Sequence, residues 1–151
     1  MADFPVKLSL RIDWSEMDLF GHVNNVAYFK YIQASRVNYW EQSGLQRLFD
    51  EHRLGPILLS TGCQFRMPLF YPGNIIVEAR VSFIRNTSFG LEHRILSSSG
   101  EVAAEAKDVI VTYDFKTNGK VRVPDSFRAS VAQIEGVSLD SLQSGDTFFP
   151  V

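Results

Sequence analysis

Residues 6–14 show a regular alternation of apolar and polar positions. From Val6 to Trp14 every second residue is apolar, and the residues between them are charged or carry a hydroxyl. Successive side chains of a strand point to opposite faces, so this period of two predicts a strand with one buried face. A polar segment from Asp18 to Asn25 then ends the alternation.

The segment that follows has the spacing of a helix and is apolar over much of its surface. Asn24 or Asn25 can cap its start and Gly44 can terminate it, so we expect one helix from there to about Ser43. Several aromatic or aliphatic side chains share one side of it at helical spacing: Tyr28, Phe29, Ile32, Tyr39 and Trp40. Because many of the other positions are also apolar, we expect other elements to enclose most of this helix.

The second half of the chain is predicted to be mostly strands. Apolar runs and alternation favour strands over residues 57–65, 75–84, 91–96 and 102–115. Turn residues at 97–101 and 118–119 join neighbouring segments. Short helices are expected over 45–53 and from Pro124 to about Ile134.

The order of these elements predicts the fold class. Strands joined by short turns must be antiparallel. One strand, one long helix and then consecutive antiparallel strands are typical of an α+β fold, here an antiparallel sheet wrapped around one long central helix. With 151 residues and no visible repeat or linker, we expect a single domain over residues 1–151.

Composition and charge exclude several classes of protein. The formal net charge is −2 and the basic residues are spread thinly, so we expect no nucleic-acid partner. Cys63 is the only cysteine, which excludes an internal disulfide and a cysteine metal cluster, and we expect it to be a core residue. The sequence has no apolar run of membrane-spanning length and no signal-peptide pattern, so the expected location is cytoplasmic.

Familiar catalytic patterns are missing from the sequence. It has no glycine-rich phosphate loop and no Gly-x-Ser-x-Gly motif. His22, His52 and His93 do not have the spacing of a metal site, so we expect no metal and no redox cofactor. Candidate chemistry is therefore confined to polar segments at the ends of the predicted elements.

Asp18 lies between the end of the first strand and the start of the long helix. Its spacing alone favours a turn aspartate that accepts backbone hydrogen bonds. It can also be a base or a nucleophile beside the positive end of the helix. Gly21 supports this second interpretation because it lets a backbone N–H approach a ligand closely, and free N–H groups at the helix start can hold an oxyanion. A carboxylate and an oxyanion hole in one turn form a hydrolytic arrangement.

Other polar residues have two interpretations each. His22 can be a general acid or base, or a turn histidine, and Asn25 can hydrogen-bond a carbonyl or a water, or cap the helix. Tyr28 is favoured as a core aromatic. The segment Arg85–Gly90 can be only a turn, or it can contact a phosphate or a pantetheine chain. Its candidate binding residues are Arg85, Asn86, Thr87 and Ser88.

Three segments together resemble the hotdog-fold thioesterases, in particular the 4-hydroxybenzoyl-CoA thioesterase-like family of acyl-CoA thioesterases. The first is RIDWSEMDLFGHVNNVAYFKYIQASRVNYW, similar to that family's Asp-x-x-Gly-x-x-x-x-x-x-Tyr segment and central helix. The second is FRMPLFYPGNIIVEARV and the third is RNTSFGLEHRI. Their order and spacing match the family over about residues 5 to 115, which implies the hotdog fold.

The resemblance implies a thioester hydrolase with Asp18 as nucleophile or general base. Relatives often carry a histidine where this chain has Asn25, whereas here His22 directly follows the glycine, so both are candidate catalytic residues. The N–H groups around Val23 to Asn25 are the implied oxyanion donors. The implied oxyanion and substrate contacts are Gly21, Val23, Asn24 and Tyr28.

The family forms dimers and often tetramers, with each active site between two subunits. The resemblance therefore implies a homo-oligomer in which Arg85–Phe89 of one chain face the CoA portion of a ligand in the partner's site. The acyl group and the carrier, coenzyme A or acyl carrier protein, stay open. Two other functions also stay open: a hotdog-fold enoyl-thioester hydratase and a non-catalytic acyl-thioester-binding protein.

Overall fold

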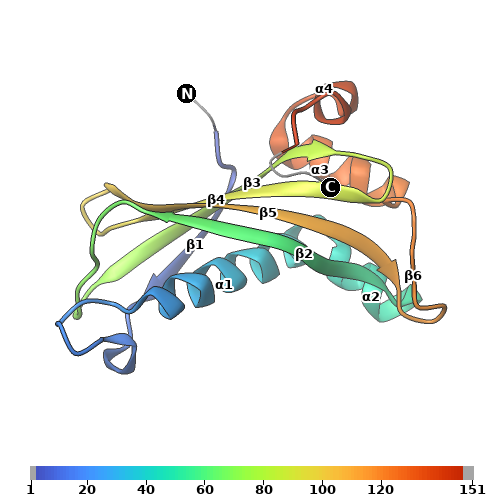
Figure 1. Ribbon diagram of the computed structural model, residues 1–151. Coiled ribbons are helices and arrows are strands. Elements are labelled where there is room, and N and C mark those ends of the chain that lie inside the picture. Colours follow the sequence, from blue (N-terminus) through green and yellow to red (C-terminus); the bar gives the residue numbers. More distant parts are fainter. Residues whose placement is uncertain (1–2, 148–151) are drawn as a thin grey trace.

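In residues 3–147, which the computed structural model describes, six strands form one antiparallel sheet, and the long helix α1 lies against one face of it (Figure 1). The strands are β1 (Val6–Arg11), β2 (Leu54–Phe65), β3 (Asn74–Ile84), β4 (Ser88–Leu96), β5 (Val102–Asp114) and β6 (Gly119–Lys120). The helices are the 3₁₀ helix η1 (Trp14–Glu16), α1 (Asn25–Ser43), α2 (Leu45–His52), α3 (Asp125–Glu135) and α4 (Leu139–Gln143). The predicted α+β class is confirmed.

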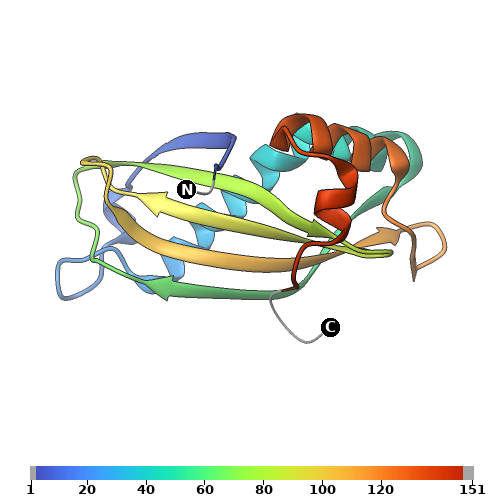
Figure 2. The same cartoon turned by 90° about the horizontal axis from the view of Figure 1, so that it is seen from above.

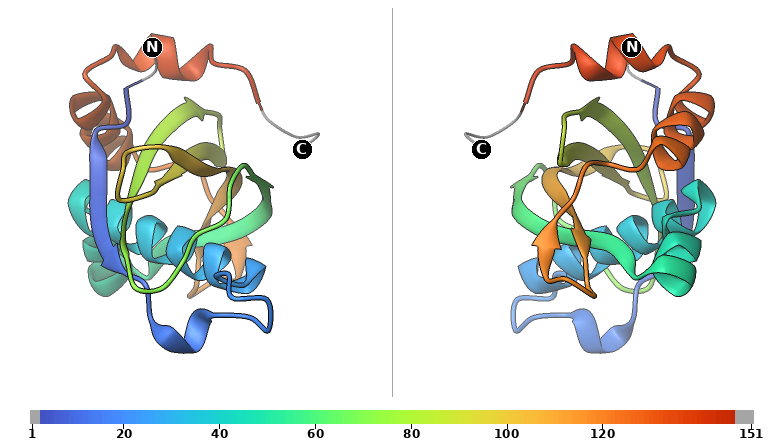
Figure 3. Two further views of the ribbon diagram at one scale, coloured as in Figure 1. Left: turned by 90° about the vertical axis from the view of Figure 1, so that its left-hand side faces the viewer. Right: turned by 90° about the vertical axis from the view of Figure 1, so that its right-hand side faces the viewer.

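The strand order is β1-β3-β4-β5-β2, and β6 pairs with β5. Views along the strands show the sheet curving partway round α1 (Figure 3). The helices α3 and α4 cover the end of the sheet where β3 passes into β4 (Figure 2). Because β1 and β2 are the outermost strands of this order, one edge of β2 has no strand partner within the described chain.

The helix α1 begins and ends where the sequence predicts. Asn24 caps its start by accepting the N–H of Ala27 at 2.8 Å, and Gly44 ends it with a φ of 83°, a left-handed conformation that glycine adopts readily. Its buried side chains are Ala27, Tyr28, Tyr31, Ile32, Ser35, Tyr39, Trp40 and Ser43. The opposite side is open, since Val26 is 64% exposed. Other elements therefore enclose α1 on one side only, and not over most of its surface as predicted, because the sheet curves round one side of the helix.

The sheet face away from α1 is charged. Alternate residues of a strand point to opposite faces, so the positions between the apolar core residues of β3 and β4 point outward. Lys7 and Arg94 both contact Glu78, at 2.6 and 2.7 Å. The Arg94 guanidinium also lies 4.0 Å from the ring centroid of Phe4. A hollow of about 610 Å³ on this face is lined by such charged side chains.

Several element boundaries differ from the sequence predictions. β1 ends at Arg11 because Asp13 caps the short helix η1, which replaces the predicted end of the strand. β4 begins at Ser88, so part of the predicted turn over 85–90 belongs to the strand. The helix α4 has no predicted counterpart, because a helix of 5 residues carries too short a pattern to recognise.

A polar cluster is buried between α1 and the sheet. His93 and Asp108 are 1% and 0% exposed, and Nε2 of His93 lies 2.7 Å from Oδ2 of Asp108. Arg36 Nε donates to the same carboxylate at 2.9 Å, and Thr61 Oγ1 donates to it at 2.7 Å. Ser35 Oγ lies 2.9 Å from Nδ1 of His93. These contacts join α1 to β2, β4 and β5.

Candidate active site

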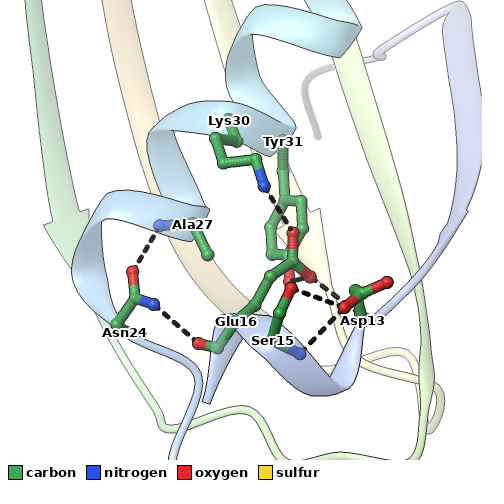
Figure 4. Close-up of polar contacts among 7 residues, drawn as sticks. All are labelled: Asp13, Ser15, Glu16, Asn24, Ala27, Lys30 and Tyr31. Atoms are coloured by element: carbon green, nitrogen blue, oxygen red, sulfur yellow. Dashed lines mark hydrogen bonds and ion pairs between the residues drawn. The ribbon is translucent and has the colours of Figure 1, made fainter. Parts of the chain in front are cut away.

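The loop between β1 and α1 is built on a capping box. Asp13 accepts the N–H of Ser15 at 2.8 Å and its hydroxyl at 2.6 Å (Figure 4). In return, the carboxylate of Glu16 accepts the N–H of Asp13 at 2.8 Å. An aspartate followed three residues later by a glutamate is a recognisable sequence signal for such a helix start.

Glu16 links this loop to α1. Its buried carboxylate accepts the Tyr31 hydroxyl at 2.7 Å and Lys30 Nζ at 3.2 Å (Figure 4). Burial opposes ionisation of Glu16, but the hydrogen bonds that it accepts outweigh burial and lower its pKa. The carbonyl of Glu16 accepts both the backbone N–H and the side-chain amide of Asn24 at 2.8 Å. Glu16 therefore fixes the place where α1 begins, a role that the sequence analysis did not assign.

Asp18 is at the centre of the polar turn before α1. Its Oδ1 accepts the N–H groups of Phe20 at 2.8 Å and His22 at 3.1 Å, so the turn interpretation is confirmed. Gly21 has a φ of 84°, and no atom lies within 4 Å of the position that a Cβ would occupy. The glycine therefore serves the left-handed backbone of the turn. Within the described chain the second carboxylate oxygen, Oδ2, accepts no hydrogen bond, and the side chain is exposed.

A hollow of about 450 Å³ lies between this turn, the start of α1 and the segment after β2. Its walls are Asp18, His22, Val23, Asn25, Tyr28, Phe65, Arg66, Met67 and Pro68. The structure thus brings Asp18, His22 and Asn25 to one place, as the sequence predicts. The aromatic and aliphatic walls offer an apolar surface beside one exposed carboxylate.

The expected oxyanion donors need a correction. The N–H of Val23 donates to the carbonyl of Leu69 at 2.9 Å, and the N–H of Asn24 donates to a loop carbonyl at 2.8 Å, so neither is available to a ligand. In the described residues the N–H groups of Asn25 and Val26 donate to no acceptor. These are the first two residues of α1, where a helix leaves its amides unpaired. Of the expected donors Val23 to Asn25, only Asn25 therefore keeps a free N–H, because the contacts of the loop with Leu69 and Glu16 cannot be seen in the sequence.

Tyr28 forms part of the wall of this hollow. Its hydroxyl donates to the carbonyl of Met67 at 3.1 Å, and its ring meets that of Phe65 edge-on at 5.1 Å between centroids. Burial raises the pKa of the phenol, which keeps it neutral. The favoured core role is confirmed, and the same ring borders the hollow.

The segment Arg85–Phe89 lies far from Asp18 within one chain. The two sites flank opposite ends of β3 (Figure 1), which has 11 residues, so they are roughly 35 Å apart at the usual rise of a strand. Arg85 donates to the carbonyls of Gln143, at 2.7 Å, and Gly145. Phe89 is fully buried in the core. Within the described chain both side chains therefore have partners, and contact of this segment with CoA stays a prediction.

Ser35, His93 and Asp108 form a serine–histidine–aspartate series that the sequence analysis missed. The three residues come from α1, β4 and β5, so no sequence motif joins them. Each is at most 1% exposed, and none lines the hollow beside Asp18. A substrate carbonyl cannot reach a hydroxyl sealed in this way, so the geometry favours a structural role.

Two further properties concern only residues 3–147. In this part of the chain, no three metal-binding side chains converge as a cation site would require. None of its helices combines the length and the apolar character needed to span a membrane.

A curved antiparallel sheet around one helix, with a carboxylate turn at the helix start, defines the class of hotdog-fold thioesterases. The model of the thioesterase-like superfamily matches residues 12–131, and the chain belongs to this superfamily. The expected family and fold are thereby confirmed, and the protein is an enzyme of the thioesterase class. The match extends into α3, beyond the residues that carry the resemblance in the sequence.

Individual relatives agree with this assignment. The chloroplastic acyl-acyl carrier protein thioesterase ATL3 of Arabidopsis thaliana is 32% identical over 133 residues, 85% of this chain and 68% of that protein. The long-chain acyl-CoA thioesterase FadM of Escherichia coli K12 is 20% identical over 130 residues, 85% of this chain and 98% of FadM. A thioesterase of Thermus thermophilus solved with coenzyme A and zinc has the same fold, with a TM-score of 0.79 and 22% identity over 91% of this chain and 99% of that chain.

Proposed function

We propose that the protein hydrolyses acyl thioesters of coenzyme A or acyl carrier protein in the hollow beside Asp18. One observation carries the proposal: Asp18, with one free carboxylate oxygen, and Asn25, whose N–H donates to no acceptor in the described residues, line the same hollow. A carboxylate can activate the attacking group, and paired N–H groups can bind the oxygen that becomes negative.

Two routes use this geometry. Asp18 can remove a proton from water, whose oxygen then adds to the thioester carbonyl. The C–S bond breaks, the thiol leaves with the proton, and the acyl group leaves as the free acid. Alternatively, Asp18 attacks the carbonyl, the C–S bond breaks and the thiolate leaves. Water then hydrolyses the resulting anhydride to the free acid and the Asp18 carboxylate, and its proton goes to the thiolate. On both routes the N–H groups of Asn25 and Val26 stabilise the oxyanion, and His22 and the side chain of Asn25 are further candidates for contact with the reacting groups.

The carrier is proposed from the relatives, and the kind of acyl group is proposed from the walls of the hollow. The Arabidopsis relative acts on acyl carrier protein thioesters and the Escherichia coli relative on long-chain acyl-CoA. The apolar walls formed by Tyr28, Phe65 and Met67 suit an apolar acyl group. Release of free thiol from a panel of acyl groups on both carriers tests the proposal. Binding of the thioesters without thiol release across the panel would contradict hydrolysis and favour a binding protein.

We further propose that two chains complete each site. Within residues 3–147 one edge of β2 has no strand partner, and the strand bears the exposed residues Ile57, Leu58 and Leu59. Antiparallel pairing of two β2 edges about a twofold axis brings residues 85–88 of one chain toward Asp18 of the other. Homodimers and tetramers built on this pair stay predictions, as does the cytoplasmic location.

Replacing Leu59 by aspartate should convert the dimer to a monomer and lower thioester hydrolysis by at least about tenfold, because it buries a charge in an edge-to-edge interface. Light scattering after size exclusion measures the first effect and thiol release the second. Val137→Asp is the matched control, since Val137 is similarly exposed, at 42% against 49%, and lies outside β2. A dimer that persists in Leu59→Asp would contradict the β2 interface.

Ser35→Ala should retain hydrolysis within about threefold of the unmodified protein. Within residues 3–147 the Ser35 hydroxyl hydrogen-bonds to the buried His93 alone and does not line the hollow beside Asp18. Loss of one buried hydrogen bond should lower stability by about 1 kcal/mol. Steady-state thiol release checks the prediction. A fall of a hundredfold or more in a folded Ser35→Ala variant would instead assign the chemistry to the serine.

A further inference from the structure

Arg128 is a buried cation in the apolar face of α3. It is 2% exposed, and its neighbours on the same face are Phe127 and Val131. Within the described residues no carboxylate forms an ion pair with it. A guanidinium in such a place is unfavourable unless its donors are all satisfied. An apolar side chain would suit this face of α3 better, so we expect the guanidinium of Arg128 to have a specific role.

The guanidinium of Arg128 hydrogen-bonds to the turn between β3 and β4. Its Nε donates to the carbonyl of Val123 at 2.9 Å, and its Nη2 donates to the carbonyls of Arg85 at 2.7 Å and Asn86 at 3.1 Å. Arg85 and Asn86 begin the turn that joins β3 to β4. One side chain thus binds two successive carbonyls of the turn and one of the segment that leads into α3.

Other contacts turn the same carbonyls inward. The carbonyl of Asn86 also accepts the N–H of Val123 at 2.8 Å, and the carbonyl of Thr87 accepts the N–H of Thr112 at 2.9 Å. Since these carbonyls face the protein, the N–H groups of Asn86 and Thr87 are left without an acceptor in the described chain. Free backbone N–H groups such as these can donate hydrogen bonds to an anionic ligand.

We propose that Arg128 is a positioning residue that presets the turn 85–88 to bind a phosphate of the coenzyme A portion of the substrate. The inference rests on the proposed function, in which this turn reaches the partner's site. The N–H groups of Asn86 and Thr87 contact the phosphate, and Arg128 acts through the turn without touching the ligand. Arg85, whose side chain holds the C-terminal segment, adds positive charge nearby.

The test compares one acyl group on two carriers, coenzyme A and pantetheine, which lacks every phosphate. Arg128→Met should raise KM for acyl-CoA by at least about tenfold with kcat changed less than twofold, because charge-assisted hydrogen bonds to phosphate are lost. KM for the acyl-pantetheine should stay within about twofold. A purely structural role would change both substrates alike.

Two variants keep this test decisive. Arg122→Met removes an exposed guanidinium near the same segment, one that pairs with Asp125 and not with the turn, and should leave both KM values unchanged. Arg128→Lys keeps the charge but cannot reach all three carbonyls, and should raise KM for acyl-CoA alone. It replaces Arg128→Met if circular dichroism shows that variant unfolded.

The possible outcomes distinguish the role of Arg128 from the proposed thioesterase function. Equal changes for both substrates, or no change for either, would overturn the role of Arg128 and leave the thioesterase proposal standing. If the unmodified protein hydrolyses neither thioester, the proposed function and the inference fall together.

Discussion

Asp18→Asn should lower kcat for thioester hydrolysis by roughly 10²–10⁴-fold, the range for loss of one general base or nucleophile. Asparagine keeps an oxygen that can accept the N–H groups of Phe20 and His22, so the turn and the start of α1 should persist. The amide cannot take a proton from water or form an anhydride. Steady-state thiol release and the circular dichroism spectrum of the variant measure the two halves of the prediction.

Asp13→Asn is the matched control for this experiment. Asp13 is an exposed carboxylate of the same loop, but it caps η1 and does not line the hollow beside Asp18. Its replacement removes the same charge from nearly the same place, so activity should stay within a few-fold. Equal losses in the two variants would mean that loop structure or overall charge, and not Asp18 itself, supports hydrolysis.

Asp108→Ala should lower the free energy of unfolding by about 3–5 kcal/mol. The substitution leaves Arg36 and His93 without their carboxylate in a sealed space between α1 and the sheet. Urea unfolding at a fixed protein concentration measures the effect. Glu105→Ala, which breaks the exposed pair with Arg66, should change stability by at most about 1 kcal/mol. A similarly small change for Asp108→Ala would contradict the structural role of the cluster.

The same aspartate gives stability a pH dependence. Burial opposes its ionisation, but the hydrogen bond and charge of His93 and the charge of Arg36 outweigh burial and lower the pKa of Asp108. A carboxyl group with a lowered folded-state pKa stabilises the protein above its unfolded pKa, and that contribution is lost as the pH falls through the folded value. Acidification below about pH 4 should therefore destabilise the unmodified protein more steeply than Asp108→Asn.

Much of the fold could be predicted because its signals are local. Asn24 and Gly44 mark the ends of α1 in the sequence, alternation marks β3, and a largely apolar run marks β5. The candidate site could also be located in the sequence, since the polar turn that contains Asp18 leads into the start of α1. The length of β1 was not predictable, because the capping pair Asp13 and Glu16 overrides an alternation that continues to Trp14.

The details of the site depend on contacts between distant segments. Whether the N–H of Val23 is free depends on the carbonyl of Leu69, which lies more than 40 residues away along the chain. The sequence makes Arg85 a candidate for phosphate contact, but in the fold its guanidinium donates to carbonyls of α4 and of the turn that follows α4. The cluster around His93 likewise joins residues from separate elements, so no spacing in the sequence could reveal it.

The crystal structure of Asp18→Asn with a bound acyl-CoA tests the central claim most directly. We predict that the thioester carbonyl oxygen lies within hydrogen-bond distance of the N–H groups of Asn25 and Val26, with residue 18 beside the carbonyl carbon. A thioester bound in the charged hollow on the other face of the sheet, lined by Arg80 and Glu92, would contradict the account.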